Sequence, residues 1–203
     1  MLEILAAAGR QLQQNSVPEL IAVLLAIVYL VLAVKEKIAC WYAAFASTFI
    51  FLIIFWNVNL YMEAMLQIYY LAMAVYGWYQ WTHPGSGKTQ LPVSTWSLRQ
   101  HALALSIIGG ATVISGYYLS AYSDQHLPYV DSFTTWGGVV TTVMVARKIL
   151  ENWIYWLVID GVSIFLYLDR ELYFTALLFC AYIVIIFFGW YRWMKTWRAQ
   201  ATA

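Results

Sequence analysis

Two stretches of the chain decide its fold: residues 76–81 read YGWYQW, and residues 188–193 read FGWYRW. They lie 112 residues apart, and the same shift aligns the residues upstream of them without a gap. It pairs Trp41 with Trp153, Leu60 with Leu172, Tyr61 with Tyr173, Ala64 with Ala176, Glu19 with Asp131 and Lys35 with Arg147. A belt of interfacial aromatic residues would explain Trp and Tyr at helix ends, but not a register kept over roughly 60 residues. We therefore interpret the match as an internal repeat.

The composition of the chain is that of a membrane protein. Of the 203 residues, 63% are hydrophobic and only 10% are charged, whereas soluble domains carry about 25% charged residues. The aromatic share of 18% excludes a disordered chain. With a net charge of +1, no bulk electrostatic field recruits nucleic acid. The composition thus argues against a soluble enzyme and against a nucleic-acid-binding protein.

Seven apolar runs are candidates for membrane-spanning helices, each of which needs about 20 mostly apolar residues. The runs are 17–34, 38–56, 61–81, 102–122, 133–146, 150–168 and 172–193. The fifth is short unless Asp131 and Arg147 lie at its two interfaces. The links are short, and residues 1–16 lack the basic start of a signal peptide. We expect residues 1–203 to form one all-α integral membrane domain with seven transmembrane helices.

The repeat predicts a 3+1+3 arrangement of these spans. Repeat one covers about 17–81 and repeat two about 131–193, while the run at 102–122 links them. Three spans plus one bring the second unit back in the orientation of the first, so the repeat is parallel. Parallel repeats occur in transporters, whose substrate site lies between the halves near the membrane midplane.

The positive charges predict the orientation of the chain. Nine of the eleven Lys and Arg residues fall on one side of the predicted spans: Lys35, Lys37, Lys88, Arg99, Arg147, Lys148, Arg192, Lys195 and Arg198. Only Arg10 and Arg170 fall on the other side. Because cytoplasmic loops carry the excess of positive charge, we expect an external N-terminus and a cytoplasmic C-terminus.

Asp160 is the clearest ionisable residue inside a predicted span, and such residues are functional candidates. It shares one helical face with Trp153, Trp156, Ser163 and Tyr167. Aromatic rings around one carboxylate suit a flat, cationic or polar heteroaromatic ligand. The alternative is that Asp160 only bonds a neighbouring Ser, Thr or Tyr and holds helices together.

Gln67 is the second polar candidate, and Tyr70 follows it on the same face of the third span. At 1.5 Å per residue, Gln67 lies about 9 Å and Asp160 about 12 Å below the outer surface. The two residues could therefore face one cavity from different halves.

The start of the sixth span holds two further polar residues, Glu151 and Asn152. They could cap the helix, or Glu151 could form an inner gate with Arg147 and Lys35. The three His residues are scattered over loops on both sides, so no metal site is expected. No Lys lies inside a span, which excludes a retinal Schiff base.

Residues 147–160, RKILENWIYWLVID, together with the run from Gln67 to Trp81 and the 3+1+3 layout, resemble the PnuC family of vitamin transporters. The resemblance covers nearly all of the chain after residue 17. It implies a seven-helix fold like that of SWEET transporters, often a homotrimer, in the lipid bilayer of a bacterial inner membrane. Family members carry nicotinamide riboside, and the related PnuT branch carries thiamine. The resemblance also implies facilitated diffusion without a cofactor, in which a cytoplasmic kinase traps the vitamin by phosphorylation.

The same resemblance implies that Gln67, Trp153, Trp156 and the polar position 160 bind the substrate. Nicotinamide riboside transporters tend to carry Asn at the position of Asp160 and near that of its repeat mate, Thr48. A carboxylate can serve the thiazolium or the aminopyrimidine of thiamine, so we favour thiamine and keep nicotinamide riboside as the alternative. Both are cationic, so charge alone does not decide between them. The substrate-binding set that we expect is Asp160, Gln67, Trp153, Trp156, Tyr70, Thr48, Asn152 and Ser163.

Two other protein classes could use seven spans. A ligand-binding receptor without transport would usually carry a signalling loop or tail, and the predicted inner loops are short. An intramembrane enzyme would need at least a pair of catalytic groups at one depth, and the spans contain a single clear carboxylate. We therefore expect a transporter and not an enzyme.

Overall fold

The computed structural model describes residues 7–11, 16–57, 59–85, 90–123 and 126–202. In these residues seven long helices follow one another: α2 (Val17–Val34), α3 (Ala39–Asn57), α4 (Tyr61–Thr82), α5 (Leu98–Tyr122), α6 (Pro128–Ala146), α7 (Asn152–Asp169) and α8 (Tyr173–Ala201). Residues 7–11 add a short helical segment, and one isolated bridge pairs Ser94 with Ile149. The predicted all-α class is confirmed.

Some helix ends differ from the predicted spans. α5 begins at Leu98 rather than at 102, because Ser97 and Gln100 form a capping box. The Ser97 hydroxyl accepts from the Gln100 amide, and the Gln100 side chain accepts from the Ser97 amide at 2.8 Å. α6 begins at Pro128, so Asp131 lies in its first turn. Hydropathy marks the apolar part of a helix, whereas hydrogen bonds set where the helix begins and ends.

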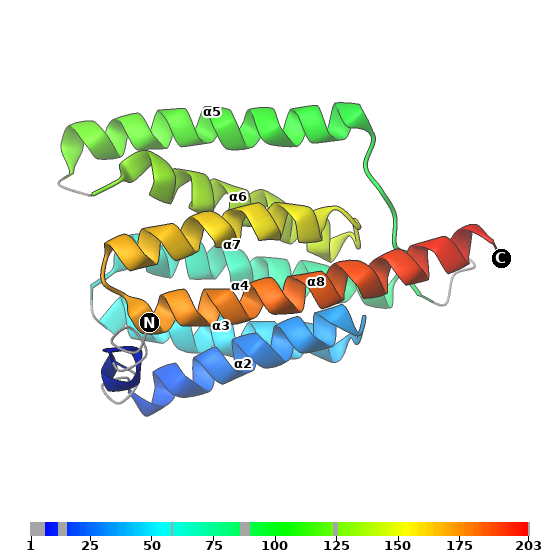
Figure 1. The fold of residues 1–203 in the computed structure, drawn as a ribbon. Helices are drawn as coiled ribbons and strands as arrows, with labels where there is room; N and C mark the ends of the chain where they lie inside the picture. Colours follow the sequence, from blue (N-terminus) through cyan, green and yellow to red (C-terminus); the bar gives the residue numbers. More distant parts are fainter. Residues whose placement is uncertain (1–6, 12–15, 58, 86–89, 124–125, 203) are drawn as a thin grey trace.

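Six of the helices close into a ring and α5 lies outside it. α2 packs on α3, α3 on α4, α4 on α6, α6 on α7, α7 on α8, and α8 again on α2. α5 packs on α6 at one edge of the bundle, and α8 runs beyond the ends of its neighbours (Figure 1). The ring thus consists of two three-helix groups, α2–α4 and α6–α8, which meet at the α4–α6 and α2–α8 contacts.

Each three-helix group is held by a Trp ring against a Gly. A Cβ added at Gly189 would lie 2.6 Å from the ring of Trp153, and a Cβ at Gly77 would overlap the ring of Trp41. Only Gly lets the backbone of α8 or α4 approach an indole this closely. The contact that joins α3 to α4 therefore recurs between α7 and α8.

Two further indoles tie the groups to each other. Nε1 of Trp81 donates to the carbonyl of Ala146, and Nε1 of Trp193 donates to the carbonyl of Ala33, each at 3.1 Å. The two Trp rings lie 6.2 Å apart. The α4–α6 and α2–α8 contacts are thus closed by nearly equivalent hydrogen bonds.

The outer surface of the bundle, which includes α5, is strongly apolar. Among the described residues, α2, α3, α5 and α8 are each long and apolar enough to cross a membrane by length and composition. Large apolar side chains, including Leu24, Ile114 and Phe187, are exposed on these helices. Such a continuous apolar surface is typical of contact with lipid.

Candidate functional site

A cavity of about 160 Å³, here called the central cavity, lies between the two three-helix groups. Its walls come from α2, α3, α4, α6 and α7, and they carry aromatic rings and hydroxyl groups. The lining residues are Ala26, Tyr29, Trp41, Ala44, Ser47, Thr48, Tyr70, Ala74, Thr142 and Trp156. Three residues of the predicted substrate-binding set, Thr48, Tyr70 and Trp156, therefore share one cavity.

Gly138 on α6 brings two of these side chains together. A Cβ at Gly138 would lie 2.9 Å from the hydroxyl of Tyr70 and 3.7 Å from the ring of Trp156. The Tyr70 side chain comes from α4 and the Trp156 side chain from α7, so this Gly lets residues of opposite groups approach each other. Adjacent Gly residues in a span, such as Gly137 and Gly138, are typical of close helix packing.

Trp41 is a cavity residue that the predicted set did not include. It is buried, and its indole N–H has no acceptor among the described residues. A buried donor without a partner is uncommon and calls for an explanation, such as a ligand. The sequence feature that could have identified Trp41 as a site residue is the repeat, which pairs it with the predicted site residue Trp153.

Asp160 lies beside the central cavity rather than in its lining. It is 4% exposed and lies one helical turn after Trp156 on α7. Among the described residues, none donates a hydrogen bond to its carboxyl group, which burial removes from water. Asp160 is also close enough to Tyr182 and Tyr167 to interact with them electrostatically. The helix-holding alternative requires a hydrogen-bond partner that the described residues do not supply.

The other predicted binding residues lie elsewhere in the bundle. Gln67 is partly buried on α4 but does not line the central cavity, and Ser163 is buried one turn beyond Asp160. Trp153 packs edge-on against Trp193, with ring centroids 5.3 Å apart. Asn152 is fully buried at the start of α7, where its Nδ2 donates to the carbonyl of Ile149 at 2.6 Å.

An ion pair joins the turns that follow α2 and α6. Nζ of Lys148 lies 3.0 Å from Oε2 of Glu36, and the Lys148 side chain is only 3% exposed. The ammonium group also lies 4.6 Å above the ring of Trp81, and the other oxygen of Glu36 accepts from the hydroxyl of Thr196 at 2.8 Å. Glu36 and Lys148 have similar left-handed backbones, with φ of 54° and 52°. We call these two residues the inner ion pair, because the distribution of positive charge predicts that this end of the bundle is cytoplasmic.

The three residues predicted as an inner gate are not joined to one another. Glu151 accepts from the backbone amide of Trp96 at 3.3 Å. Arg147 is exposed and donates from Nε to the hydroxyl of Tyr76 at 3.1 Å. Lys35 is exposed between α2 and α8. The inner ion pair is formed instead by Glu36 and Lys148, the residues that follow Lys35 and Arg147 in the sequence. They lie 112 residues apart and have opposite charges, and this feature of the sequence could have predicted the pair.

A second hollow, of about 340 Å³, lies between α4, α5 and α6 at the other end of the bundle. Its lining includes the carboxylates of Glu63 and Asp131 and the buried hydroxyl of Ser132. Asp131 lies 3.6 Å from a guanidinium nitrogen of Arg170. This hollow is acidic, whereas the opposite end carries Lys35, Lys148 and other cations.

Comparisons with known proteins agree with this architecture. A family model described as nicotinamide mononucleotide transporter matches residues 16–195. The riboflavin/roseoflavin transporter RibM of Streptomyces davaonensis is 26% identical over 180 residues, which cover 86% of this chain and 83% of RibM. The nicotinamide riboside transporter PnuC of Escherichia coli is 24% identical over 196 residues, which cover 84% of this chain and 82% of that transporter.

The fold also matches a solved structure. The crystal structure of the vitamin B3 transporter PnuC aligns with a TM-score of 0.71 over 97% of this chain and 90% of that chain. The sequence identity in this alignment is 20%, so the match concerns the fold alone.

Proposed function

The chain belongs to the PnuC family of vitamin transporters, which the nicotinamide mononucleotide transporter model describes, and from this premise we propose that it carries thiamine by facilitated diffusion. It is a membrane transporter and not an enzyme. The choice of substrate rests on position 160: by the family resemblance, nicotinamide riboside transporters tend to carry Asn there. This chain instead has a buried carboxylate that accepts no hydrogen bond from the described residues and lies one turn from the aromatic central cavity. A carboxylate at this place can neutralise a cationic ring system.

We propose that α2–α8 all cross the membrane and that α2–α4 and α6–α8 are parallel repeats within one domain. Helices of 18 residues are about 27 Å long, close to the roughly 30 Å of the hydrocarbon core. The recurrence at a shift of 112 of the Trp–Gly contacts and of the left-handed turns supports the repeat. We extend to this chain the homotrimer that the family resemblance implies.

In the proposed site, the vitamin ring stacks on the aromatic walls of the central cavity. Trp156 and Tyr70 offer ring faces, the Trp41 indole N–H and the Thr48 hydroxyl offer polar contacts, and Asp160 supplies the charge. The volume of about 160 Å³ is below the roughly 300–1,000 Å³ typical of ligand pockets. The cavity must therefore widen to admit a vitamin, as expected when the two halves of a transporter rock against each other.

The inner ion pair supports a role in closing the cytoplasmic end. Glu36 follows α2 and Lys148 follows α6, so the pair connects the two halves at the end where the positive charges gather. Release of the vitamin on this side would require the pair to separate or move aside. The acidic hollow at Glu63 and Asp131 would attract a cation at the opposite end.

Nicotinamide riboside is the second candidate substrate. A relative that is 24% identical is a nicotinamide riboside transporter, and a flat pyridinium ring would stack on the same walls. Dissociation constants for both vitamins, measured on the same variants, separate the two candidates.

Asp160→Ala should weaken thiamine binding about 10- to 100-fold, because a charged hydrogen bond in a poorly solvated site contributes about 1.5–3 kcal/mol. Asp160→Asn keeps the shape and removes the charge, so thiamine should lose affinity. The preference should shift toward nicotinamide riboside, because Asn is the residue that transporters of this vitamin tend to carry at the position. Calorimetric titration of purified protein with each vitamin provides the constants.

Asp169→Asn, which changes an exposed carboxylate on the same helix, is the matched control and should leave both constants unchanged. If Asp160→Asn and Asp160→Ala both move each constant by less than twofold in a folded protein, Asp160 does not bind the vitamin.

Transport should need no driving ion. Liposomes that contain the purified protein should take up thiamine down its gradient without an imposed proton or sodium gradient, because the spans offer no chain of buried acids or His for a coupled proton. Accumulation above the external concentration should require an internal thiamine kinase with ATP, which traps the product. Accumulation that depends on an ion gradient and persists without kinase contradicts this mechanism.

The orientation can be tested by cysteine labelling. The predicted cytoplasmic Lys88 and external Asp124 lie outside the described residues, so the test uses Gln200→Cys and His126→Cys. In a Cys180→Ser background, a membrane-impermeant maleimide added to intact cells should label position 126 and not position 200. The Cys180→Ser protein without an added Cys is the negative control and should not be labelled, because its remaining Cys40 is buried. The reverse labelling pattern contradicts a cytoplasmic C-terminus.

A further inference from the structure

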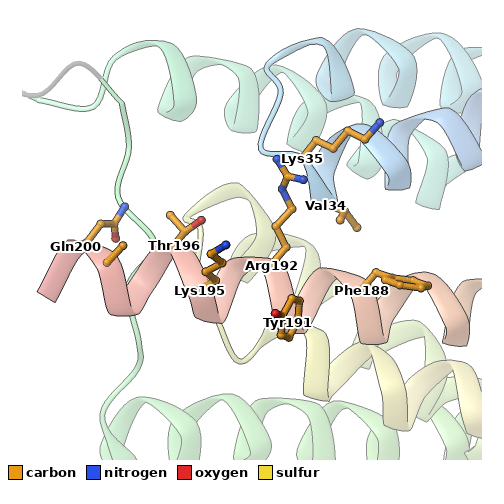
Figure 2. A pocket seen from close by; sticks show the side chains of 9 residues that line it. Val34, Lys35, Phe188, Tyr191, Arg192, Lys195, Thr196 and Gln200 are labelled. Atoms are coloured by element: carbon orange, nitrogen blue, oxygen red, sulfur yellow. The ribbon is translucent and has the colours of Figure 1, made fainter. Parts of the chain in front are cut away.

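A groove of about 870 Å³ runs between the end of α2 and the last turns of α8, separate from the central cavity. We call it the basic groove, because three cationic side chains line it without an acidic one. Its lining residues are Val34, Lys35, Phe188, Tyr191, Arg192, Lys195, Thr196, Ala199 and Gln200. Figure 2 shows that Arg192 reaches from α8 toward the end of α2, where Lys35 lies.

The groove changes from apolar to cationic along α8. Phe188, Arg192 and Lys195 are spaced by four and three residues, so they share one face of the helix. Phe188 and Tyr191 are 65% and 70% exposed. The charges of Arg192 and Lys195 begin about 6 Å further along the axis. An acyl chain followed by a headgroup has the same order of apolar and charged parts.

The positive charges of the groove are not neutralised within the described residues. No described carboxylate lies within ion-pair distance of Lys35, Arg192 or Lys195. The nearest acidic residue in the sequence, Glu36, is already engaged: one carboxylate oxygen accepts from Nζ of Lys148, and the other accepts from the hydroxyl of Thr196. The groove therefore lacks an anion that would balance three cations.

The groove lies at the level where lipid headgroups are expected. Trp190 and Trp197 lie on α8 at the same level along the helix and are partly buried against the core, and Trp78 lies near the same end of α4. Trp residues gather at the boundary between hydrocarbon and headgroups. Basic pockets between helices at this boundary on the cytoplasmic side favour anionic lipid headgroups.

We propose that the basic groove binds an anionic phospholipid, whose phosphate contacts Lys35, Arg192 and Lys195 and whose acyl chain lies along Val34 and Phe188. The site is independent of the vitamin and goes beyond transport itself. A soluble phosphate would use the cations but leave the exposed apolar wall uncovered, which favours a lipid.

The test is the thermal unfolding of the purified protein in neutral detergent, titrated with phosphatidylglycerol or with phosphatidylcholine of the same acyl chains. Phosphatidylglycerol should raise the unfolding temperature at lower concentration, because a ligand of the native state stabilises it. Lys35→Gln/Arg192→Gln/Lys195→Gln should weaken this effect on the order of 100-fold, about fivefold for each cation. Arg99→Gln, an exposed cation at the start of α5, should have no effect.

A single variant and a competition experiment complete the test. Lys195→Gln alone should weaken the effect about fivefold, which covers the case in which the triple variant does not fold. sn-Glycerol 3-phosphate should compete poorly with the lipid. Equal stabilisation by both lipids, an unchanged effect in the Gln variants, or full competition by glycerol phosphate would each overturn the proposal.

Discussion

Lys148→Met is expected to lower the free energy of unfolding by about 3–5 kcal/mol, because it leaves the carboxylate of Glu36 without its cation. Met keeps the length and apolar stem of Lys, so the change isolates the charge. The Lys148 side chain is 3% exposed, and water therefore cannot replace the lost partner from that side. Denaturant titration in detergent micelles, followed by circular dichroism, measures the loss.

A second substitution tests whether the unpaired carboxylate of Glu36 causes the loss. In Glu36→Gln/Lys148→Met both charges are gone, and Gln can still accept the hydrogen bond from Thr196. Replacing both partners of a buried ion pair is often nearly neutral, so the double variant should recover most of the stability. Lys37→Met, an exposed neighbour, should change it by less than about 0.5 kcal/mol. A double variant as unstable as Lys148→Met would show that an uncompensated charge on Glu36 is not the cause of the loss.

The helices could be predicted because each one needs only local information. A run of apolar residues between charged turns defines α2, whose observed bounds, Val17–Val34, match the prediction. The start of α5 was missed although Ser97 and Gln100 have the spacing of a capping box. The end of α8 was missed because its last turns, which include Arg198, are polar and continue beyond the apolar run.

The candidate site could be predicted only in part, because a helical period shows which residues share a face and not what that face meets. The period placed Trp153 and Trp156 together, yet Trp156 lines the central cavity while Trp153 packs on Trp193. The inner ion pair of Glu36 and Lys148 depends on how two turns, far apart in the sequence, approach each other. Such contacts between the two halves form only when the six helices close into a ring, and the sequence of one segment alone cannot predict them.

The two Gly residues under the Trp rings are the places where added bulk should be tolerated least. Gly189→Leu and Gly77→Leu should each lower the free energy of unfolding by about 3 kcal/mol, the upper end of the usual range for overpacked cores. A Cβ alone at Gly189 would lie 2.6 Å from the ring of Trp153, and a rigid buried indole cannot turn away. The same denaturant titration provides the measurement.

Gly109→Leu on α5 and Gly161→Leu on α7 are matched controls, because a Cβ at either place meets nothing within 4 Å. Both should be neutral or slightly stabilising, since Gly is a poor helix former. Gly189→Leu/Trp153→Ala should regain more than about 1 kcal/mol over the sum of the single changes, because the Leu side chain then fills the space of the ring. If Gly189→Leu is no worse than Gly161→Leu, the indole is not what holds α7 against α8. Equal losses at Gly77 and Gly189 would mean that the two halves rely on the same contact, as expected if one three-helix unit was duplicated.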